Sequence, residues 1–181
     1  SKKAPGDTVV KDVSAICMLD AAYNDKTGQV GIVLVLRSAT AVSKDDRVVL
    51  VTKKASMAPQ VTVIDGAGTK MTNGACHYGL TAARVAATDE GFTVATYAKK
   101  TPKSFGDLSL VTVTKTAINK LSLDAIAVAT TDATIESKPV PPLAWRGLGD
   151  ILYNSVDKTV TLVTEADTIN GRAILLHTLK P

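Results

Sequence analysis

The chain has 181 residues, of which 45% are hydrophobic and 21% charged, and its formal net charge is +4. No apolar stretch approaches the roughly 20 residues that a membrane-spanning helix needs, and no signal-peptide type of apolar segment follows the N-terminus. The mild basic excess permits contact with nucleic acid but does not require it. Aromatic residues make up only 4%, so the core must be filled by Val, Leu, Ile and Ala.

Residues 1–11 are polar and include Pro5 and Gly6, which predicts a flexible N-terminal arm. The remaining residues, 12–181, are expected to form a single domain, because a chain of this length can bury its own core.

Short apolar runs predict β-strands along the first half of the chain. They cover residues 13–19, 29–37, 47–52 and 60–64. The second run is apolar almost throughout, so both of its faces are expected to be covered. The sequence Asp-Gly-Ala-Gly at 65–68 predicts a turn after the fourth run.

The middle of the chain gives less uniform signals. Residues 80–87 fit either a strand or a helix because they are rich in alanine. Strands are expected at 91–98, 108–114 and 124–130, a short helix at 116–121, and a helical turn at 145–153. Three prolines within residues 137–142 predict an extended, exposed segment.

The chain ends in two further strands, at 158–164 and 172–178, which are expected to pair through a turn at Asp167–Gly171. Their predicted core residues are Val160, Leu162, Ile174 and Leu176. With about nine or ten short strands and no long helix, the pattern predicts an all-β fold, an antiparallel β-sandwich or barrel.

The two cysteines and two histidines offer little chemistry. Cys17 and Cys76 can form a disulfide, but two free thiols in a reducing cytoplasm are the favoured interpretation. Cys76 and His77 are neighbours, yet no nucleophile signature or Cys-x-x-Cys zinc motif surrounds them. His177 is expected to be a partly buried imidazole in a hydrogen bond.

Acidic pairs occur at Asp45–Asp46, Asp89–Glu90 and Glu165/Asp167. Such pairs can serve glycoside hydrolysis or hold a cation at a subunit contact, but solvated turn residues are the expected interpretation. The glycines at 66–68 lack phosphate-loop spacing. We therefore expect no catalytic residue, no metal and no cofactor.

Lysines follow the ends of several predicted strands and also occur in the arm. Such lysines improve solubility and block edge pairing, or they contact phosphates without sequence preference. The candidate RNA-binding set is Lys2, Lys3, Lys11, Lys53, Lys54, Lys99, Lys100 and Lys103.

The last third of the chain resembles the capsid proteins of the bromovirus and cucumovirus family. The resemblance lies in Asp-Ala-Ile-Ala-Val-Ala-Thr at 124–130, Trp-Arg-Gly-Leu-Gly-Asp-Ile-Leu at 145–152, the strand 160–164, and Ala-Ile-Leu-Leu-His at 173–177. It implies an eight-stranded viral jelly roll and a subunit interface, for which the candidates are Trp145, Arg146, Leu179 and Pro181.

The resemblance also implies a function. We expect a non-enzymatic coat protein of a small positive-strand RNA virus, which assembles in many copies into an icosahedral shell and packages RNA through non-specific lysine–phosphate contacts. It would be found in the virion, and in the host cytoplasm during assembly. The alternatives are a β-sandwich binding or phage decoration module and a small carboxylate-dependent hydrolase.

Overall fold

The computed structural model describes residues 13–38, 47–64, 81–99, 106–122, 144–168 and 171–180, and all regular structure in these ranges is β-strand. The strands are β1 (Val13–Asn24), β2 (Gln29–Ser38), β3 (Arg47–Lys54), β4 (Gln60–Val63), β5 (Thr81–Ala87), β6 (Gly91–Lys99), β7 (Gly106–Thr114), β8 (Ile118–Ser122), β9 (Ala144–Asn154), β10 (Thr159–Thr168) and β11 (Gly171–Leu179).

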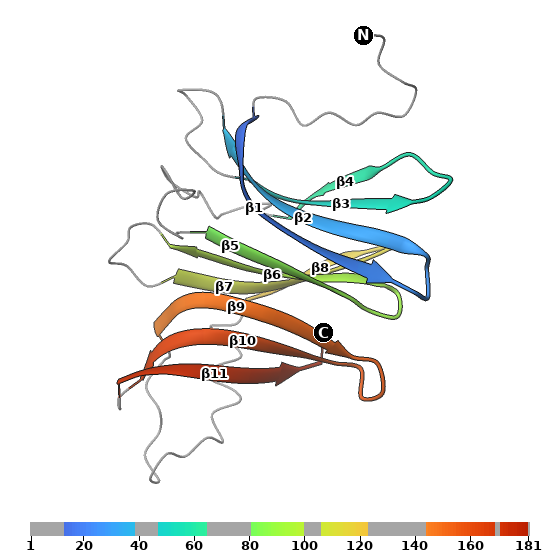
Figure 1. Cartoon of the computed structure of the whole chain (residues 1–181). Coiled ribbons are helices and arrows are strands. Elements are labelled where there is room, and N and C mark those ends of the chain that lie inside the picture. Colours follow the sequence, from blue (N-terminus) through green and yellow to red (C-terminus); the bar gives the residue numbers. More distant parts are fainter. Residues whose placement is uncertain are drawn as a thin grey trace.

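The strands form two antiparallel sheets (Figure 1). One has the order β1-β2-β3-β4, and the other has the order β11-β10-β9-β7-β6-β5; β8 pairs with residues 109–113 on the same edge of β7 that meets β9 at Gly106. In the second sheet β9 meets β7 at one described pair, Gly106 with Trp145. As Figure 1 shows, β5–β8 therefore lie as a middle layer between β1–β4 and β9–β11.

Strands β5 and β6 of the middle layer are covered on both faces, and alternate residues of each strand point to opposite sides. On β6, Phe92 and Val94 belong to the core beneath β1–β4, whereas Ala95 and Tyr97 belong to the core above β9–β11. On β5 the small residues alternate in the same way. Ala82 and Ala86 belong to the core above β9–β11, whereas Ala83 and Ala87 face the core beneath β1–β4. Small side chains suit a strand covered on both faces, and this resolves the ambiguity of residues 80–87 in favour of a strand.

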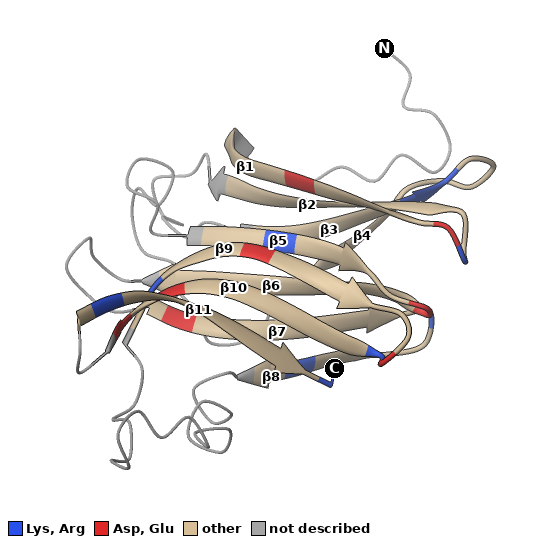
Figure 2. Cartoon of the chain, turned by 60° about the horizontal axis from the view of Figure 1, so that its bottom comes forward, with Lys and Arg blue, Asp and Glu red and all other residues tan. Residues whose placement is uncertain are grey.

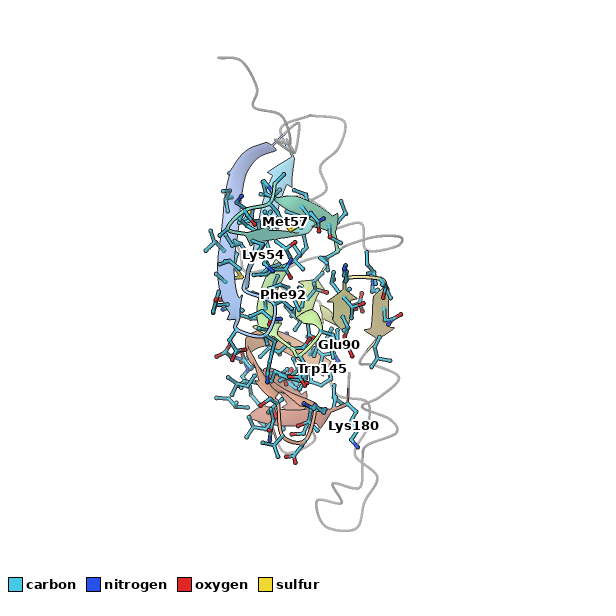
Figure 3. All side chains as sticks on the ribbon, turned by 90° about the vertical axis from the view of Figure 1, so that its right-hand side faces the viewer. Lys54, Met57, Glu90, Phe92, Trp145 and Lys180 are labelled. Atoms are coloured by element: carbon cyan, nitrogen blue, oxygen red, sulfur yellow. The ribbon has the colours of Figure 1, made fainter. Side chains whose placement is uncertain are left out.

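Two glycines give room to the large aromatic rings of these cores. A Cβ atom on Gly31 of β2 would lie 2.5 Å from the ring of Phe92, and one on Gly106 of β7 would lie 2.1 Å from the ring of Tyr97. Figure 3 shows Phe92 between the β1–β4 sheet and the middle layer. Glycine is required at both positions because the rings occupy the space that a side chain would take.

Two hairpins share one local design, which sequence reasoning missed. β1 and β9 each end in Asp-x-x-Tyr-Asn, at 20–24 and 150–154, and a four-residue turn follows each. In both turns the asparagine Oδ1 accepts hydrogen bonds from the second and third following amides. Both turns end in a residue with positive φ, Gly28 at 67° and Lys158 at 55°.

The prediction of an all-β antiparallel sandwich is confirmed. The finer prediction, a jelly roll, requires Greek-key connections. In both sheets the described neighbouring strands are instead consecutive in the sequence, as in a meander, except that β7 lies beside β9. The jelly-roll connectivity is therefore not confirmed.

Two expectations of helical structure are wrong. Residues 116–121 contribute to strand β8, and residues 145–153 lie within β9. In β9 two irregularities in its register with β10 interrupt the alternation of apolar residues, which gave the false helical pattern. The arm at 1–11, the turn at 65–68, the strand at 124–130 and the proline segment at 137–142 lie outside the described residues.

The pairing of the last two strands is confirmed, but half of their predicted core is wrong. Val160 and Leu162 are buried, whereas Ile174 and Leu176 are 76% and 71% exposed. Val160 lies opposite Leu179, and Leu162 lies opposite His177. Because residues in register share a face, the odd-numbered residues of β11 point inward.

Candidate functional site

The outer face of the β1–β4 sheet is almost entirely apolar. Asp20 and Met18 of β1 point inward to β5, where they accept hydrogen bonds from the amides of Val85 and Ala83. The alternate residues therefore point outward. We call this surface the outer apolar face; it comprises Leu19, Ala21, Tyr23, Val30, Ile32, Leu34, Val49, Val51, Val61 and Val63. Val49 is the buried member of this face, and the exposed Lys53 lies beside Val30 at its end.

Several members of the outer apolar face are strongly exposed. Leu19 is 60% exposed, Tyr23 is 65% and Val63 is 56%. The register places Ala21, Ile32, Val51 and Val61 side by side across the four strands. Contiguous apolar patches of more than a few hundred Å² are rare on monomeric proteins and usually mark an interaction surface.

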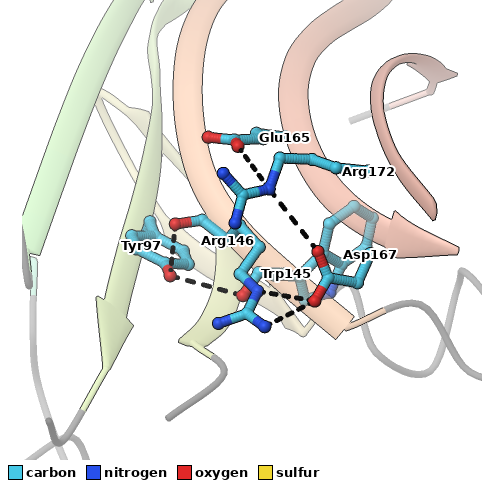
Figure 4. Close-up of polar contacts among 6 residues, drawn as sticks. All are labelled: Tyr97, Trp145, Arg146, Glu165, Asp167 and Arg172. Carbon is cyan, nitrogen blue, oxygen red and sulfur yellow. Dashed lines mark hydrogen bonds and ion pairs between the residues drawn. The ribbon is translucent and has the colours of Figure 1, made fainter. Parts of the chain in front are cut away.

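Charged residues lie mainly at strand ends and in turns, as Figure 2 shows. One charged corner lies where β9, β10 and β11 meet (Figure 4). Arg146 Nε donates to Asp167 Oδ2 at 2.8 Å, and Arg172 Nε lies 3.2 Å from Glu165 Oε1. The hydrogen bond from Arg146 holds the pKa of Asp167 below its usual value and raises the pKa of Arg146.

An open hollow of about 480 Å³ adjoins this corner. Gly147 and Gly149 contribute no side chains to it, and Val163 and Ile174 give it an apolar lining, while Glu165 and Arg172 supply the charges. Its two charged groups, Glu165 and Arg172, form an ion pair with each other.

Buried groups hold this region together from inside. The Tyr97 hydroxyl donates to the carbonyl of Arg146 at 2.7 Å, and burial raises the pKa of Tyr97 to about 12. The His177 imidazole packs edge-on against Trp145, with ring centroids 5.0 Å apart, and its Nε2 lies 3.2 Å from Thr164 Oγ1. Burial lowers the pKa of His177. The prediction of a partly buried, hydrogen-bonded His177 is confirmed.

The structure does not bring the described candidate RNA-binding lysines together. Lys54 pairs with Gln29 beside the β1–β2 turn, whereas Lys99 ends β6 at the opposite end of the molecule. We call the end of the molecule that carries the β1–β2 and β9–β10 turns the turn end; it holds Lys26, Lys53, Lys54, Lys115, Lys158 and Lys180, together with Asp25, Asp89, Glu90 and Asp157. Six lysines against four carboxylates leave this end with a small positive excess. Lys2, Lys3, Lys11, Lys100 and Lys103 lie outside the described residues.

The proposed interface residues fall in different surroundings. Trp145 and Leu179 are buried in the core between the middle layer and β9–β11, so neither side chain is available to another copy. Arg146 is partly exposed and paired with Asp167. Pro181 lies outside the described residues. The alternation of apolar residues in the sequence did not show that the Trp145 side chain points into this core.

Asp89, Glu165 and Asp167 of the described acidic pairs are held in ion pairs. Asp89 is paired with Lys158, and the hydrogen bond from Lys158 lowers the pKa of Asp89. A carboxyl group that acts as a general acid needs a raised pKa instead. Asp45, Asp46, Cys76 and His77 lie outside the described residues.

The expectation of two free thiols is wrong for Cys17, which is disulfide-bonded. The sequence holds one other cysteine, Cys76, 59 residues further along. The spacing of two cysteines does not report their distance in space, which explains the error.

The outer apolar face was not identified from the sequence as a site, although the signal was present. The continuous apolar run at 29–37 predicted a strand covered on both faces. In the structure the inward residues Val33 and Val35 are buried, while Val30 on the outer face is exposed. A continuous apolar run on a strand with one open face therefore indicates a surface that another molecule covers.

No protein-family model, curated protein or solved structure matches the chain. Within the described ranges no three His, Cys, Asp or Glu residues are grouped so as to hold a metal ion, and no helix is long and apolar enough to cross a bilayer.

Proposed function

We propose that this chain is the coat subunit of a small positive-strand RNA virus and that its work is self-assembly into a shell. The observation that supports this most is the outer apolar face, with Leu19, Tyr23 and Val63 all more than half exposed. Such a surface is unfavourable in water, and contact with further copies of the chain would remove it from water.

A shell requires identical subunits that present the same surfaces many times. The described β-sandwich supplies such surfaces, and the proposal needs only this, not the jelly-roll connectivity. The resemblance at residues 145–152, 160–164 and 173–177 points to the same class of protein.

Packaging of RNA is the second part of the proposal. Lysines of the arm, Lys2, Lys3 and Lys11, would carry most of it, because four carboxylates offset most of the charge of the six lysines at the turn end. Lysine–phosphate contacts do not depend on base identity, and they weaken steeply as salt concentration rises.

Electron microscopy of the purified protein tests self-assembly. We expect closed shells of uniform diameter from the parent chain and their loss from a Leu19→Glu/Tyr23→Glu variant, since two carboxylates would have to be buried in the contact. Val156→Glu is the matched control, because Val156 is 85% exposed but lies in the β9–β10 turn, away from the outer apolar face. A parent chain that stays monomeric at all concentrations would favour a binding or decoration module instead.

The absorbance ratio at 260 and 280 nm of purified shells tests RNA packaging. We expect copurifying nucleic acid, and less of it after Lys2→Ala/Lys3→Ala/Lys11→Ala. Equal nucleic acid in the triple variant would show that the arm is not the binding element.

A further inference from the structure

Among the described strands, the exposed edges are protected, with one exception. An open edge presents unpaired N–H and C=O groups, which act as a template for pairing with another chain. Proteins protect such edges with short strands, bulges, inward-pointing charges, lysines or covering side chains. The edges of the described strands differ in these features.

In the β1–β4 sheet both edges are protected. The pairing of β1 with β2 shifts register twice, between Val13 and Ala15 and between Ile16 and Met18, and Asp20 of β1 points inward. At the other edge β4 has only four residues.

In the second sheet three edges are also protected. The amides of β5 are covered by β1, because Val85 N donates to Asp20 Oδ2 at 2.9 Å. β8 has five residues, with an exposed Lys120 near its centre. The edge of β9 that faces β5 is bulged, and its Gly149 carbonyl accepts a hydrogen bond from Arg84 Nε at 2.7 Å.

β11 differs from all of these. It has nine residues, pairs with β10 without a register shift, and contains neither proline nor lysine. Ile174, Leu176 and Thr178 are exposed on its outer side, and His177 points inward. In the antiparallel ladder every second residue of β11 directs its N–H and C=O away from β10.

We propose that β11 pairs with β11 of a second copy in antiparallel orientation about a two-fold axis, so that the two β9–β11 layers form one continuous sheet. This inference rests on the proposed self-assembly and names one of its contacts. The partner strand is β11 of a second copy, because in an isologous contact the same strand edge of two copies can pair the free backbone groups of both.

The side chains favour one register for this pairing. With Leu175, the central residue, opposite itself, Ile174 lies opposite Leu176 of the second copy twice, and Arg172 lies opposite Thr178. A shift toward the C-terminus brings Arg172 opposite Lys180, which places like charges together. A shift the other way places Arg172 opposite Leu176. The central register alone places both Ile174 and Leu176 opposite apolar residues, and it avoids like charges.

The size of the contact predicts its strength. A standard stable interface buries about 1,600 Å² in total, and one pair of edge strands lies at the small end of the range. We therefore expect a dimer that dissociates on dilution, and a shell that needs the outer apolar face as well.

Sedimentation of the full chain over a concentration series tests the contact. Ile174→Lys/Leu176→Lys should raise the dimer dissociation constant by about tenfold or more, because it places two lysines opposite two others. Both side chains are exposed, so the fold should be retained, as circular dichroism can check. Leu152→Lys is the matched control, since Leu152 is also exposed but lies on β9, two strands from the edge.

Cross-linking tests the register. Under mild oxidation, a mixture of the Ile174→Cys and Leu176→Cys chains should give more disulfide-linked dimer than either chain alone. Equal cross-linking by either single variant, or an unchanged dissociation constant in the double-lysine variant, overturns the proposal.

The two proposals fail in distinguishable ways. Shells that form normally from Ile174→Lys/Leu176→Lys would remove the strand pairing and leave the coat function standing. A dimer that is sensitive to these changes but never assembles further would keep the strand pairing and remove the coat function.

Discussion

The β1–β2 and β9–β10 hairpins begin from nearly the same local sequence, yet they are attached to the middle layer in different ways. Asn24 is buried, and its Nδ2 donates to the carbonyls of Thr88 and Gly91, each at 2.8 Å. Asn154 is exposed, and its Nδ2 donates to Asp157 within its own turn. The β9–β10 turn reaches the middle layer through the exposed pair Lys158–Asp89 instead.

Residues at equivalent positions of the two hairpins also differ in whether they face the core. Two residues into the second strand, Gly31 of β2 is buried against Phe92, whereas Thr161 of β10 shares an exposed hydrogen bond with Thr178. A turn sequence thus sets the geometry of a hairpin but not the face that is buried. The layer on which the hairpin packs decides that.

The largest effect is expected from making β2 resemble β10 at this position. Gly31→Thr should reduce the free energy of unfolding by about 4 kcal/mol, because its side chain overlaps the Phe92 ring and buries a hydroxyl. Thr161→Gly, the reciprocal change, should cost no more than about 1 kcal/mol. Urea denaturation measures both; equal losses would contradict the difference in burial.

Removing the buried asparagine should have the next largest effect. Asn24→Ala removes the two buried hydrogen bonds from Nδ2 to the carbonyls of Thr88 and Gly91, of which the Gly91 carbonyl keeps the bond from Thr88 N, and we expect a loss of about 3 kcal/mol. Asn154→Ala should cost under about 1 kcal/mol, since water can replace its partners. If denaturation midpoints fall equally in the two variants, burial does not distinguish the two asparagines.

The turn glycine should matter less. Gly28→Lys gives the β1–β2 turn the residue that ends the β9–β10 turn, and it should cost about 1 kcal/mol because a Cβ is unfavourable at positive φ. The space itself is adequate, since the atom nearest to a Cβ at this position would be 3.9 Å away on Lys54. Thermal unfolding measures the change, and a gain in stability would contradict it.

The smallest effect concerns the exposed Lys158–Asp89 pair. The folded-state pKa of Asp89 is lowered by the hydrogen bond from Lys158, so its contribution is present above the ordinary value of 3.8 and is lost as the pH falls through the folded pKa. Asp89→Asn should therefore flatten the acid side of the stability profile. The difference from the parent should also shrink in high salt, and a salt-independent difference would argue against an ion-pair effect.

Local chemistry determined much of this fold in advance. Strands at 29–37, 47–52, 60–64, 91–98, 108–114 and 172–178 were predicted within a few residues, because alternation and turn residues act over short distances. The final hairpin was predicted for the same reason. The lysines and acidic pairs were identifiable as residue types, but their spacing in the sequence did not show that Asp89 is paired with Lys158.

Only the tertiary structure decided which face of each strand became the core. In β11 the even set, Ile174 and Leu176, and the odd set, Leu175 and Leu179, are both apolar, so the sequence permits either face to be buried. The register with β10 places the odd-numbered residues toward the core. Ile174 and Leu176 therefore lie on the exposed face of the edge strand. A one-residue change of register exchanges the two faces of a strand. The sequence therefore determined where strands form, while packing between layers determined which surfaces remain exposed for contact.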